Sequence, residues 1–144
     1  MKKLMLFGFA VFVVVLADTD RDQKLKEELK KVKEHLNTCQ HKFGKLPSYL
    51  SIKGFEQVKK KDEEYLGAIF LCYNTRLGLM SETGDLIEDR VRRFYTTLHG
   101  DSDRSKENIE KILKICKPPS HSLFTPEYKA FFFESCRDKH ILIP

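Results

Sequence analysis

The sequence predicts an all-α fold: a compact six-helix domain, cross-linked by disulfides, that encloses an apolar pocket. Three observations lead to this prediction. Apolar residues recur at steps of three and four along much of the 144-residue chain, which is the spacing of one helix face. Sequence signals for β-strands are scarce. Four cysteines stand in the part of the chain that follows an apolar leader.

The leader is predicted to be a secretory signal peptide. Two lysines precede an apolar run over residues 4–16, and Val15 and Ala17 suit the small-residue rule for a cleavage site. A bilayer-spanning helix needs about 20 apolar residues, so this run is too short, and a retained anchor helix is the alternative. We therefore expect residues 1–17 to be removed and residues 18–144 to form one domain in extracellular fluid, with no stable membrane insertion.

The charge pattern argues against a nucleic-acid partner. The formal net charge is +5, and removing the two leader lysines leaves about +3. Basic and acidic residues alternate over residues 24–31, as they do on a solvated helix face. A nucleic-acid groove would need an unbalanced basic stripe with stacking aromatic residues.

The cysteines Cys39, Cys72, Cys116 and Cys136 are expected to form two disulfides, because the count is even and the compartment oxidising. Three connectivities are possible, and the residues alone do not separate them. The two sequence-local pairings close the shortest loops, each stabilising by roughly 3 to 4 kcal/mol on the loop-entropy model. A metal site at His35, Cys39 and His41 is the alternative. It lacks a further cysteine or histidine pair nearby, so no metal is expected.

Helix starts and stops can be placed along the chain. Asp62 is expected to cap the third helix, Gly78 to end it, and Asp85 with Glu88 to cap the fourth. A threonine, a proline and an acid from Thr125 onward predict the start of the last helix, which runs to Cys136. The five preceding helices are expected over residues 22–38, 48–55, 62–77, 86–98 and 105–117.

Catalytic motifs are absent from the sequence. It has no G-x-S-x-G elbow, no H-E-x-x-H pair, no C-x-x-C pair and no phosphate-binding glycine motif. The acidic pairs have helix-capping explanations. We therefore expect neither an enzyme nor a cofactor.

The predicted short helices are rich in apolar and aromatic side chains, and the chain has eight phenylalanines and five tyrosines outside the leader. For each of them a plain core position is one interpretation. The other is a cavity for a small hydrophobic ligand, stabilised by the disulfides. The candidate lining residues are Phe55, Ile69, Phe70, Tyr73, Leu77, Leu86, Val91, Phe94, Ile112, Leu113, Tyr128, Phe131 and Phe132.

The order and spacing of the cysteines resemble the insect odorant-binding proteins of the pheromone and general odorant type, whose usual pattern has six. Ala68 stands at the position of the second cysteine and Glu127 at that of the fifth, which pair with each other in the family. Their joint absence is similar to the four-cysteine "minus-C" subgroup. The first, third, fourth and sixth cysteines of the pattern look like Cys39, Cys72, Cys116 and Cys136.

The resemblance implies the bonds Cys39–Cys72 and Cys116–Cys136 and a six-helix fold around a closed apolar pocket. It implies the transport of small hydrophobic molecules through aqueous fluid. The missing pair would tie the third helix to the sixth, so we expect a pocket that opens more easily for exchange.

Other interpretations stay open at this stage. A secreted helical signalling protein or a membrane-active helical protein would have no pocket. A weak homodimer and an unidentified membrane receptor are further possible partners. His140 and the C-terminal tail are candidates for a gate over the pocket, with an ordinary exposed histidine as the alternative.

Overall fold

The computed structural model describes residues 2–47, 50, 55, 58–120 and 123–141, and for residues 2–19 and Ile141 it describes the backbone alone. Within these residues the chain is all-helical, with one isolated antiparallel bridge between Met80 and Leu86. This confirms the all-α part of the predicted fold class. Its helices are α1 (Lys2–Phe43), α3 (Lys60–Arg76), α4 (Glu88–His99), α5 (Asp103–Ile115) and α6 (Pro126–Ile141).

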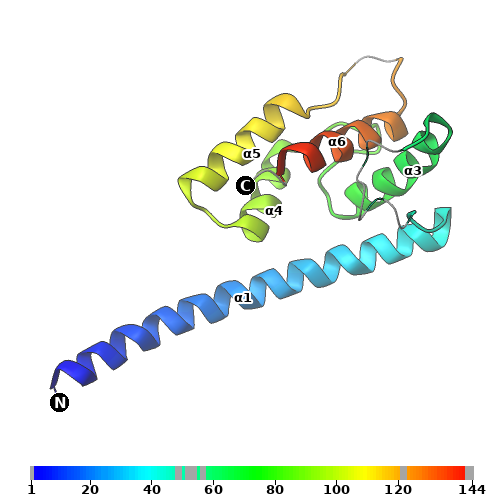
Figure 1. The fold of residues 1–144 in the computed structure, drawn as a ribbon. Helices are drawn as coiled ribbons and strands as arrows, with labels where there is room; N and C mark the ends of the chain where they lie inside the picture. The colour runs from blue at the N-terminus through cyan, green and yellow to red at the C-terminus, as the bar shows by residue number, and fades with distance from the viewer. Residues whose placement is uncertain (1, 48–49, 51–54, 56–57, 121–122, 142–144) are drawn as a thin grey trace.

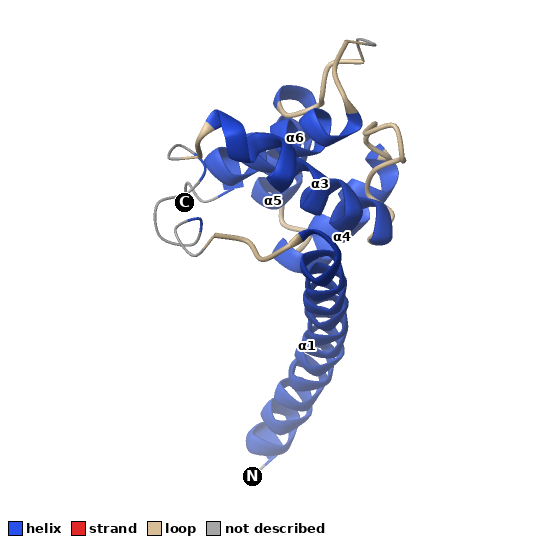
Figure 2. Ribbon diagram, turned by 90° about the vertical axis from the view of Figure 1, so that its right-hand side faces the viewer, coloured by secondary structure: helices blue, strands red, loops and turns tan. Residues whose placement is uncertain are grey.

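The second predicted helix, over residues 48–55, lies outside the described residues except for Leu50 and Phe55. Helices α3, α4, α5 and α6 pack together, and α1 runs along one side of them (Figures 1 and 2). The most extensive contact is between α3 and α6, while α1 packs against α3 and α4. The first part of α1 extends beyond the other helices (Figure 1).

Helix α1 has 42 residues and is longer than expected at both ends. It joins the expected leader to the expected helix over 22–38, because no proline and only Gly8 interrupts the apolar run. Removal of residues 1–17 stays a prediction. Among the described residues, no helix combines the length and apolar character needed to cross a membrane.

Two of the expected helix caps are wrong. Helix α3 begins before Asp62, which lies in the first turn, where its charge favours the positive helix end instead. Asp85 does not cap α4, whose N-cap is Ile87. Its carboxylate instead accepts hydrogen bonds from Thr83 Oγ1 (2.9 Å) and Lys129 Nζ (3.2 Å). These hydrogen bonds, that of Thr83 first, lower the pKa of Asp85.

Other boundary signals are confirmed. Gly78 follows α3 with a φ of 76°, a left-handed conformation that favours glycine. The backbone N–H of Tyr128 donates to Thr125 Oγ1 (3.1 Å), so the threonine caps α6 at the predicted start. Helix α5 begins two residues earlier than expected, because Ser102 Oγ accepts from the backbone N–H of Ser105.

Two disulfides cross-link the domain, with the connectivity that the resemblance implies. Cys39–Cys72 joins α1 to α3, with an S–S distance of 2.03 Å. Cys116–Cys136 joins the end of α5 to α6, with an S–S distance of 2.01 Å. No cysteine is free. One apolar core spans the helices, with Leu66, Val91 and Phe133 fully buried in it.

Candidate ligand site

The interface of α3 with α6, which we call the α3/α6 seam, contains a cluster of three aromatic rings. Phe70 of α3 is buried, and its ring centroid lies 5.6 Å from that of Phe55. The ring of Phe55 also meets Phe131 of α6 edge-on at 5.7 Å. Such ring pairs contribute beyond the area that they bury. We call these three side chains the aromatic level of the seam.

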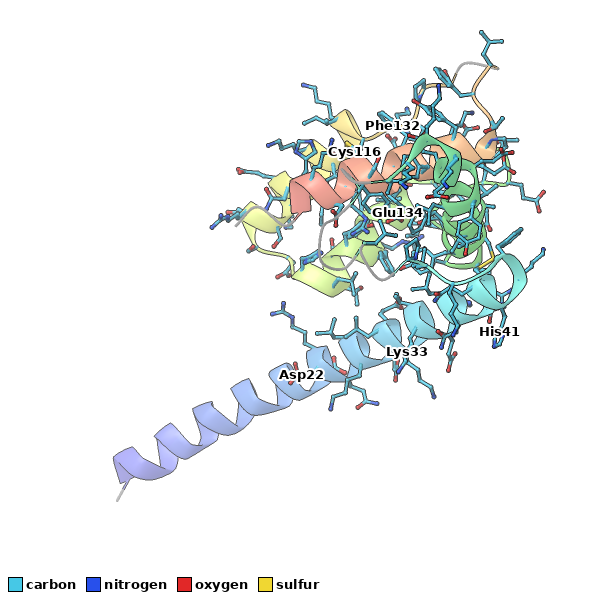
Figure 3. All side chains as sticks on the ribbon, turned by 45° about the vertical axis from the view of Figure 1, so that its right-hand side comes forward. Asp22, Lys33, His41, Cys116, Phe132 and Glu134 are labelled. Carbon is cyan, nitrogen blue, oxygen red and sulfur yellow. A yellow bond between two sulfur atoms is a disulfide. The ribbon has the colours of Figure 1, made fainter. Side chains whose placement is uncertain are left out.

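One helical turn further along the seam lies a group of polar side chains, the polar level. Asn74 is 0% exposed and its Nδ2 donates to Oε1 of Glu134, itself buried, at 2.9 Å. Figure 3 labels Glu134 among the side chains of the domain. The other carboxylate oxygen of Glu134 accepts from the guanidinium of Arg137 at 2.6 and 3.2 Å. The seam therefore has an apolar part and a hydrogen-bonded, charged part side by side.

The polar level changes the titration of the groups around it. Burial, followed by the charge of Glu134, raises the pKa of Tyr73, and burial also raises the pKa of Tyr95. Burial works to lower the pKa of Arg137, but attraction to Glu134 leaves it above its ordinary value. The Arg137 guanidinium lies 6.0 Å from the Tyr95 ring centroid. Within this ion pair Glu134 is buried and Arg137 is half-buried, so the carboxylate is largely shielded from water.

The N-terminal part of the seam is closed by a backbone contact. A Cβ added at Gly67 would collide with the carbonyl oxygen of Glu127 and lie 2.8 Å from the carbonyl carbon. Only glycine lets the two helices approach this closely. Beside this contact, Ala68 and Glu127 line a surface groove of about 340 Å³.

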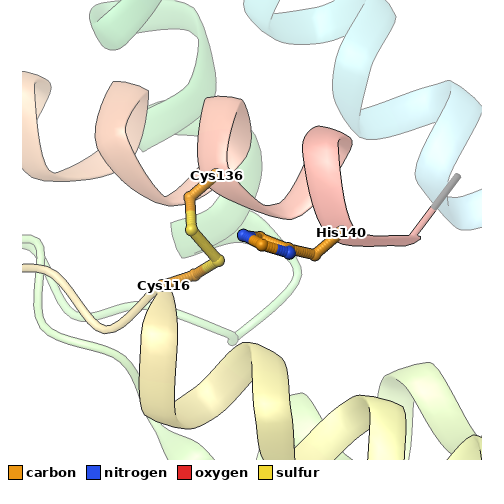
Figure 4. Close-up of side chains that lie close together, drawn as sticks. All are labelled: Cys116, Cys136 and His140. Atoms are coloured by element: carbon orange, nitrogen blue, oxygen red, sulfur yellow. A yellow bond between two sulfur atoms is a disulfide. The ribbon is translucent and has the colours of Figure 1, made fainter. Parts of the chain in front are cut away.

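The second disulfide has a histidine next to it. A nitrogen of His140 and the sulfurs of Cys116 and Cys136 lie within 4.8 Å of one another (Figure 4). The two sulfurs are bonded to each other, so the imidazole alone is left to bind a metal. The earlier metal alternative also fails to assemble, because Cys39 is in a disulfide and His35 Nδ1 accepts from Arg76 Nε at 3.2 Å.

A family model agrees with the disulfide pattern and helical fold: the model of the PBP/GOBP family matches residues 21–140. The chain belongs to this family, the insect odorant-binding proteins. Its two disulfides fit the minus-C type. A search of curated proteins and a search of solved structures found no match. Members of the PBP/GOBP family are binding and carrier proteins rather than enzymes.

The structure distributes the candidate lining residues over three environments. Tyr128 lies at the surface with 39% exposure, and its ring stacks on Phe124 at 5.0 Å. The half-buried ones are Phe55, Tyr73, Leu77, Leu86 and Phe132. The buried ones are Ile69, Phe70, Val91, Phe94, Ile112, Leu113 and Phe131. All of these except Ile69, Tyr73, Tyr128 and Phe132 pack in or against the common core.

Four hollows along the described part of the molecule each have at least one residue of α1 in their lining. Leu77 and Phe94 line one of them, together with Arg90, Arg93 and Glu28. None of these four encloses the candidate lining residues as a set. A closed apolar pocket therefore stays a prediction, as does the assignment of its lining.

Sequence reasoning missed the polar level. Asn74 follows Phe70 by four residues and Glu134 follows Phe131 by three, so each places a polar group on an apolar face. That break in the apolar pattern was the available signal. It does not say which residue on the other helix receives the hydrogen bond.

Proposed function

We propose that the protein is a secreted carrier that binds small hydrophobic ligands at the α3/α6 seam and carries them through extracellular fluid. Membership of a family of carriers supports this function. The aromatic level of Phe55, Phe70 and Phe131 carries the assignment to the seam, since these rings supply a broad apolar surface between two helices.

Binding is driven by burial of the ligand's apolar surface. At roughly 25 cal/mol per Å² of apolar area, burying a ligand of about 10 to 15 carbons supports micromolar affinity. The α3/α6 seam has no disulfide across it. Helices without a covalent cross-link separate locally at lower cost than cross-linked ones, so we expect fast ligand exchange at this seam.

A binding assay tests the proposal. The chain lacking residues 1–17 is titrated with the fluorescent probe N-phenyl-1-naphthylamine, which is then displaced by alcohols, terpenes and fatty acids. Phe131→Ala should weaken binding about tenfold, because it removes one wall of the aromatic level. Leu29→Ala is the control, since Leu29 is 50% exposed on α1 and should leave affinity unchanged. Absence of probe binding by folded protein would refute the carrier function.

Secretion has its own test. Expression of the full chain in an insect-cell host should place the protein in the medium, with Asp18 as its first residue by N-terminal sequencing. A protein retained in the cells with residues 1–17 intact would contradict this part of the proposal.

A further inference from the structure

A hollow of about 400 Å³ lies between α1 and α4, beside the end of α3, and we call it the α1/α4 hollow. Its lining has an apolar part, in which Leu79 and Phe94 are buried, and a charged part. Arg90 and Arg93 of α4 belong to the charged part, and both are exposed. The hollow shares no residue with the aromatic level of the α3/α6 seam, so it is a separate place on the molecule.

The three arginines of α4 differ in their partners. Arg92 is held by two carboxylates, since its Nε donates to Glu110 at 2.6 Å and its Nη1 donates to Asp89 at 3.0 Å. Among the residues that the structure describes, the guanidinium groups of Arg90 and Arg93 have neither a hydrogen-bond acceptor nor an ion-pair partner. Each guanidinium has five N–H donors and no acceptor. Two unpaired sets of donors therefore line one hollow.

The side chain of Arg90 is positioned by its packing against Gly78. A Cβ added at Gly78 would lie 2.7 Å from Arg90 Nη1 and 3.6 Å from Arg90 Cδ, so the side chain lies across the bare backbone of the glycine. A side chain that packing already orders loses less conformational freedom when it binds a ligand. The guanidinium of Arg90 is therefore pre-organised for an acceptor.

The charge around the α1/α4 hollow favours an anion. Arg90 and Arg93 are three residues apart on one helix, so their Cβ atoms lie about 5 to 6 Å apart and their like charges oppose each other. Among the described residues of the lining, Glu28 of α1 alone is acidic, and Lys31 pairs with it at 3.6 Å. These four side chains carry three positive charges and one negative charge. An anion of charge −2 would neutralise the hollow.

We propose that the α1/α4 hollow is a binding site for phosphomonoester groups, in which Arg90 and Arg93 both donate to the phosphate oxygens. A phosphomonoester carries about −1.5 to −2 charge at neutral pH and has three strong acceptor oxygens. It therefore accepts from two guanidinium groups at once, through charge-assisted hydrogen bonds that are short and strong. The site does not depend on the carrier function, because it lies outside the aromatic level.

The lining discriminates against other anions. A carboxylate has one charge and two oxygens, which a single guanidinium satisfies, so its binding would leave the second guanidinium unpaired. An anion with a long apolar chain gains little, because Leu79 and Phe94 are only 2% and 9% exposed and offer it little apolar surface. The hollow therefore suits a compact, doubly charged group.

Titration calorimetry with glycerol 3-phosphate tests the site, on protein expressed from the full chain in the insect-cell host. At about pH 8, where the phosphate is a dianion, and at low salt, the Kd should be about 1 mM or below. Acetate should bind at least about tenfold more weakly, because it engages one guanidinium instead of two.

Single substitutions on α4 separate a local site from a general charge effect. Arg93→Gln should weaken phosphate binding about tenfold, and Arg93→Lys, which keeps the charge and loses the planar fork, should restore part of the loss. Arg92→Gln is the matched control: it removes the same charge from the same helix, but from an arginine that is already paired, and should change the Kd by no more than about twofold. In NMR spectra the Nε–H signals of Arg90 and Arg93 should shift with phosphate, and that of Arg92 should not.

Vesicles distinguish two sources of the phosphate group, a soluble phosphomonoester and a lipid headgroup. Sedimentation is compared for vesicles of phosphatidylcholine alone and of phosphatidylcholine mixed with phosphatidic acid. Binding to the mixed vesicles by wild type and Arg92→Gln, and its loss in Arg93→Gln, would assign the lipid headgroup. Binding of glycerol 3-phosphate without binding to the mixed vesicles would assign the soluble source. Either result supports the site.

Two results would overturn the phosphate site. One is an affinity for glycerol 3-phosphate no higher than that for acetate. The other is a phosphate affinity that Arg92→Gln lowers as much as Arg93→Gln, since binding would then depend on the overall charge of α4. Both leave the carrier function standing, because the fluorescent probe measures that function at the α3/α6 seam. Absence of probe binding would refute the carrier function and leave the phosphate site standing.

Discussion

Helix α6 is held on two sides by different kinds of interaction. Against α5, the Cys116–Cys136 disulfide makes a covalent link near the C-terminal part of α6. Against α3, the seam has no covalent link and depends on the Gly67–Glu127 contact, the aromatic level and the buried Asn74–Glu134 hydrogen bond. A disulfide acts mainly by restricting the unfolded chain, whereas packing and buried hydrogen bonds stabilise the folded state.

The difference explains how a chain of the minus-C type keeps its central pair of helices together. Ala68 and Glu127, which the resemblance places at the positions of the absent cysteines, line one groove at the N-terminal part of α6. Immediately beside them, glycine brings the two backbones into contact. The close backbone contact between α3 and α6 thus holds the two helices together at the place where a disulfide is expected in six-cysteine chains.

The largest effect is expected from breaking the polar level of the α3/α6 seam. Glu134→Leu leaves Arg137 and Asn74 without their partner and should lower the free energy of unfolding by about 3 to 5 kcal/mol. Urea unfolding followed by circular dichroism measures this. Glu134→Gln keeps an acceptor for Asn74 and should cost less, and Arg137→Met added to Glu134→Leu should recover part of the loss. A Glu134→Leu protein as stable as wild type would show that the polar level contributes nothing.

Removing the covalent link on the other side should cost somewhat less. Cys116→Ala with Cys136→Ala opens a loop with a sequence separation of 20, for which the loop-entropy model gives about 3 kcal/mol. The same urea unfolding applies, with the wild-type protein under reducing and oxidising conditions as a reference. A loss well above that of Glu134→Leu would reverse the ranking of the two sides of α6.

A disulfide introduced between α3 and α6 would test whether the covalent link accounts for the difference between the two sides of α6. Ala68→Cys with Glu127→Cys should form a disulfide, raise the stability by about 2 to 3 kcal/mol, and slow ligand exchange. Mass spectrometry of the oxidised protein detects the bond, and stopped-flow release of the fluorescent probe measures exchange. Failure of the two cysteines to pair would contradict the assignment of these positions to the absent pair.

The glycine contact can be tested alone. Gly67→Ala places a methyl group against the backbone of Glu127 and should cost about 2 kcal/mol, because neither backbone can move aside without separating the helices. Ala68→Ser, at the neighbouring groove position, is the control and should stay within about 0.5 kcal/mol of wild type. A neutral Gly67→Ala would mean that the two helices separate without cost at this point.

The smallest expected effect is on the pH dependence of stability, which measures how far water is excluded around Tyr95, next to the polar level. Burial raises the folded-state pKa of Tyr95 above its ordinary value of 10.0. The folded chain therefore keeps this proton when the unfolded chain loses it, so the contribution to stability is present below pH 10 and is lost as the pH rises further. Between pH 10 and 12, the free energy of unfolding should fall by about 1 kcal/mol less per pH unit in Tyr95→Phe than in wild type, as measured by urea unfolding. If the free energy of unfolding depended on pH equally in both proteins, the Tyr95 hydroxyl would be hydrated in the folded state.

The sequence predicted what depends on short stretches of chain. Helical spacing identified the fold class, and Gly78 and Thr125 marked a stop and a start correctly. The caps expected at Asp62 and Asp85 were wrong because several residues near a helix start can satisfy its backbone, and tertiary contacts select among them. For Asp85 one of the two partners, Lys129, is 44 residues away in the sequence.

The candidate site was less predictable for the same reason. Periodicity placed Phe70 and Phe131 on apolar faces, but it does not show which faces meet. The hydrogen bond of Asn74 to Glu134 spans 60 residues, and nothing in either local pattern names the other residue. Glu134 also directly follows three phenylalanines, so the pattern around it is dominated by apolar side chains.

The four-cysteine pattern also bears on how the chain reaches its folded state. Six cysteines can pair completely in 15 ways, whereas four can pair in three. In this protein both native pairs are neighbours along the sequence, with separations of 33 and 20, so the native bonds close shorter loops than either alternative set. Replacing the long-range link between α3 and α6 by packing thus removes the hardest pairing from oxidative folding. Helix α6 reaches α3 without a thiol that could be captured by the wrong partner.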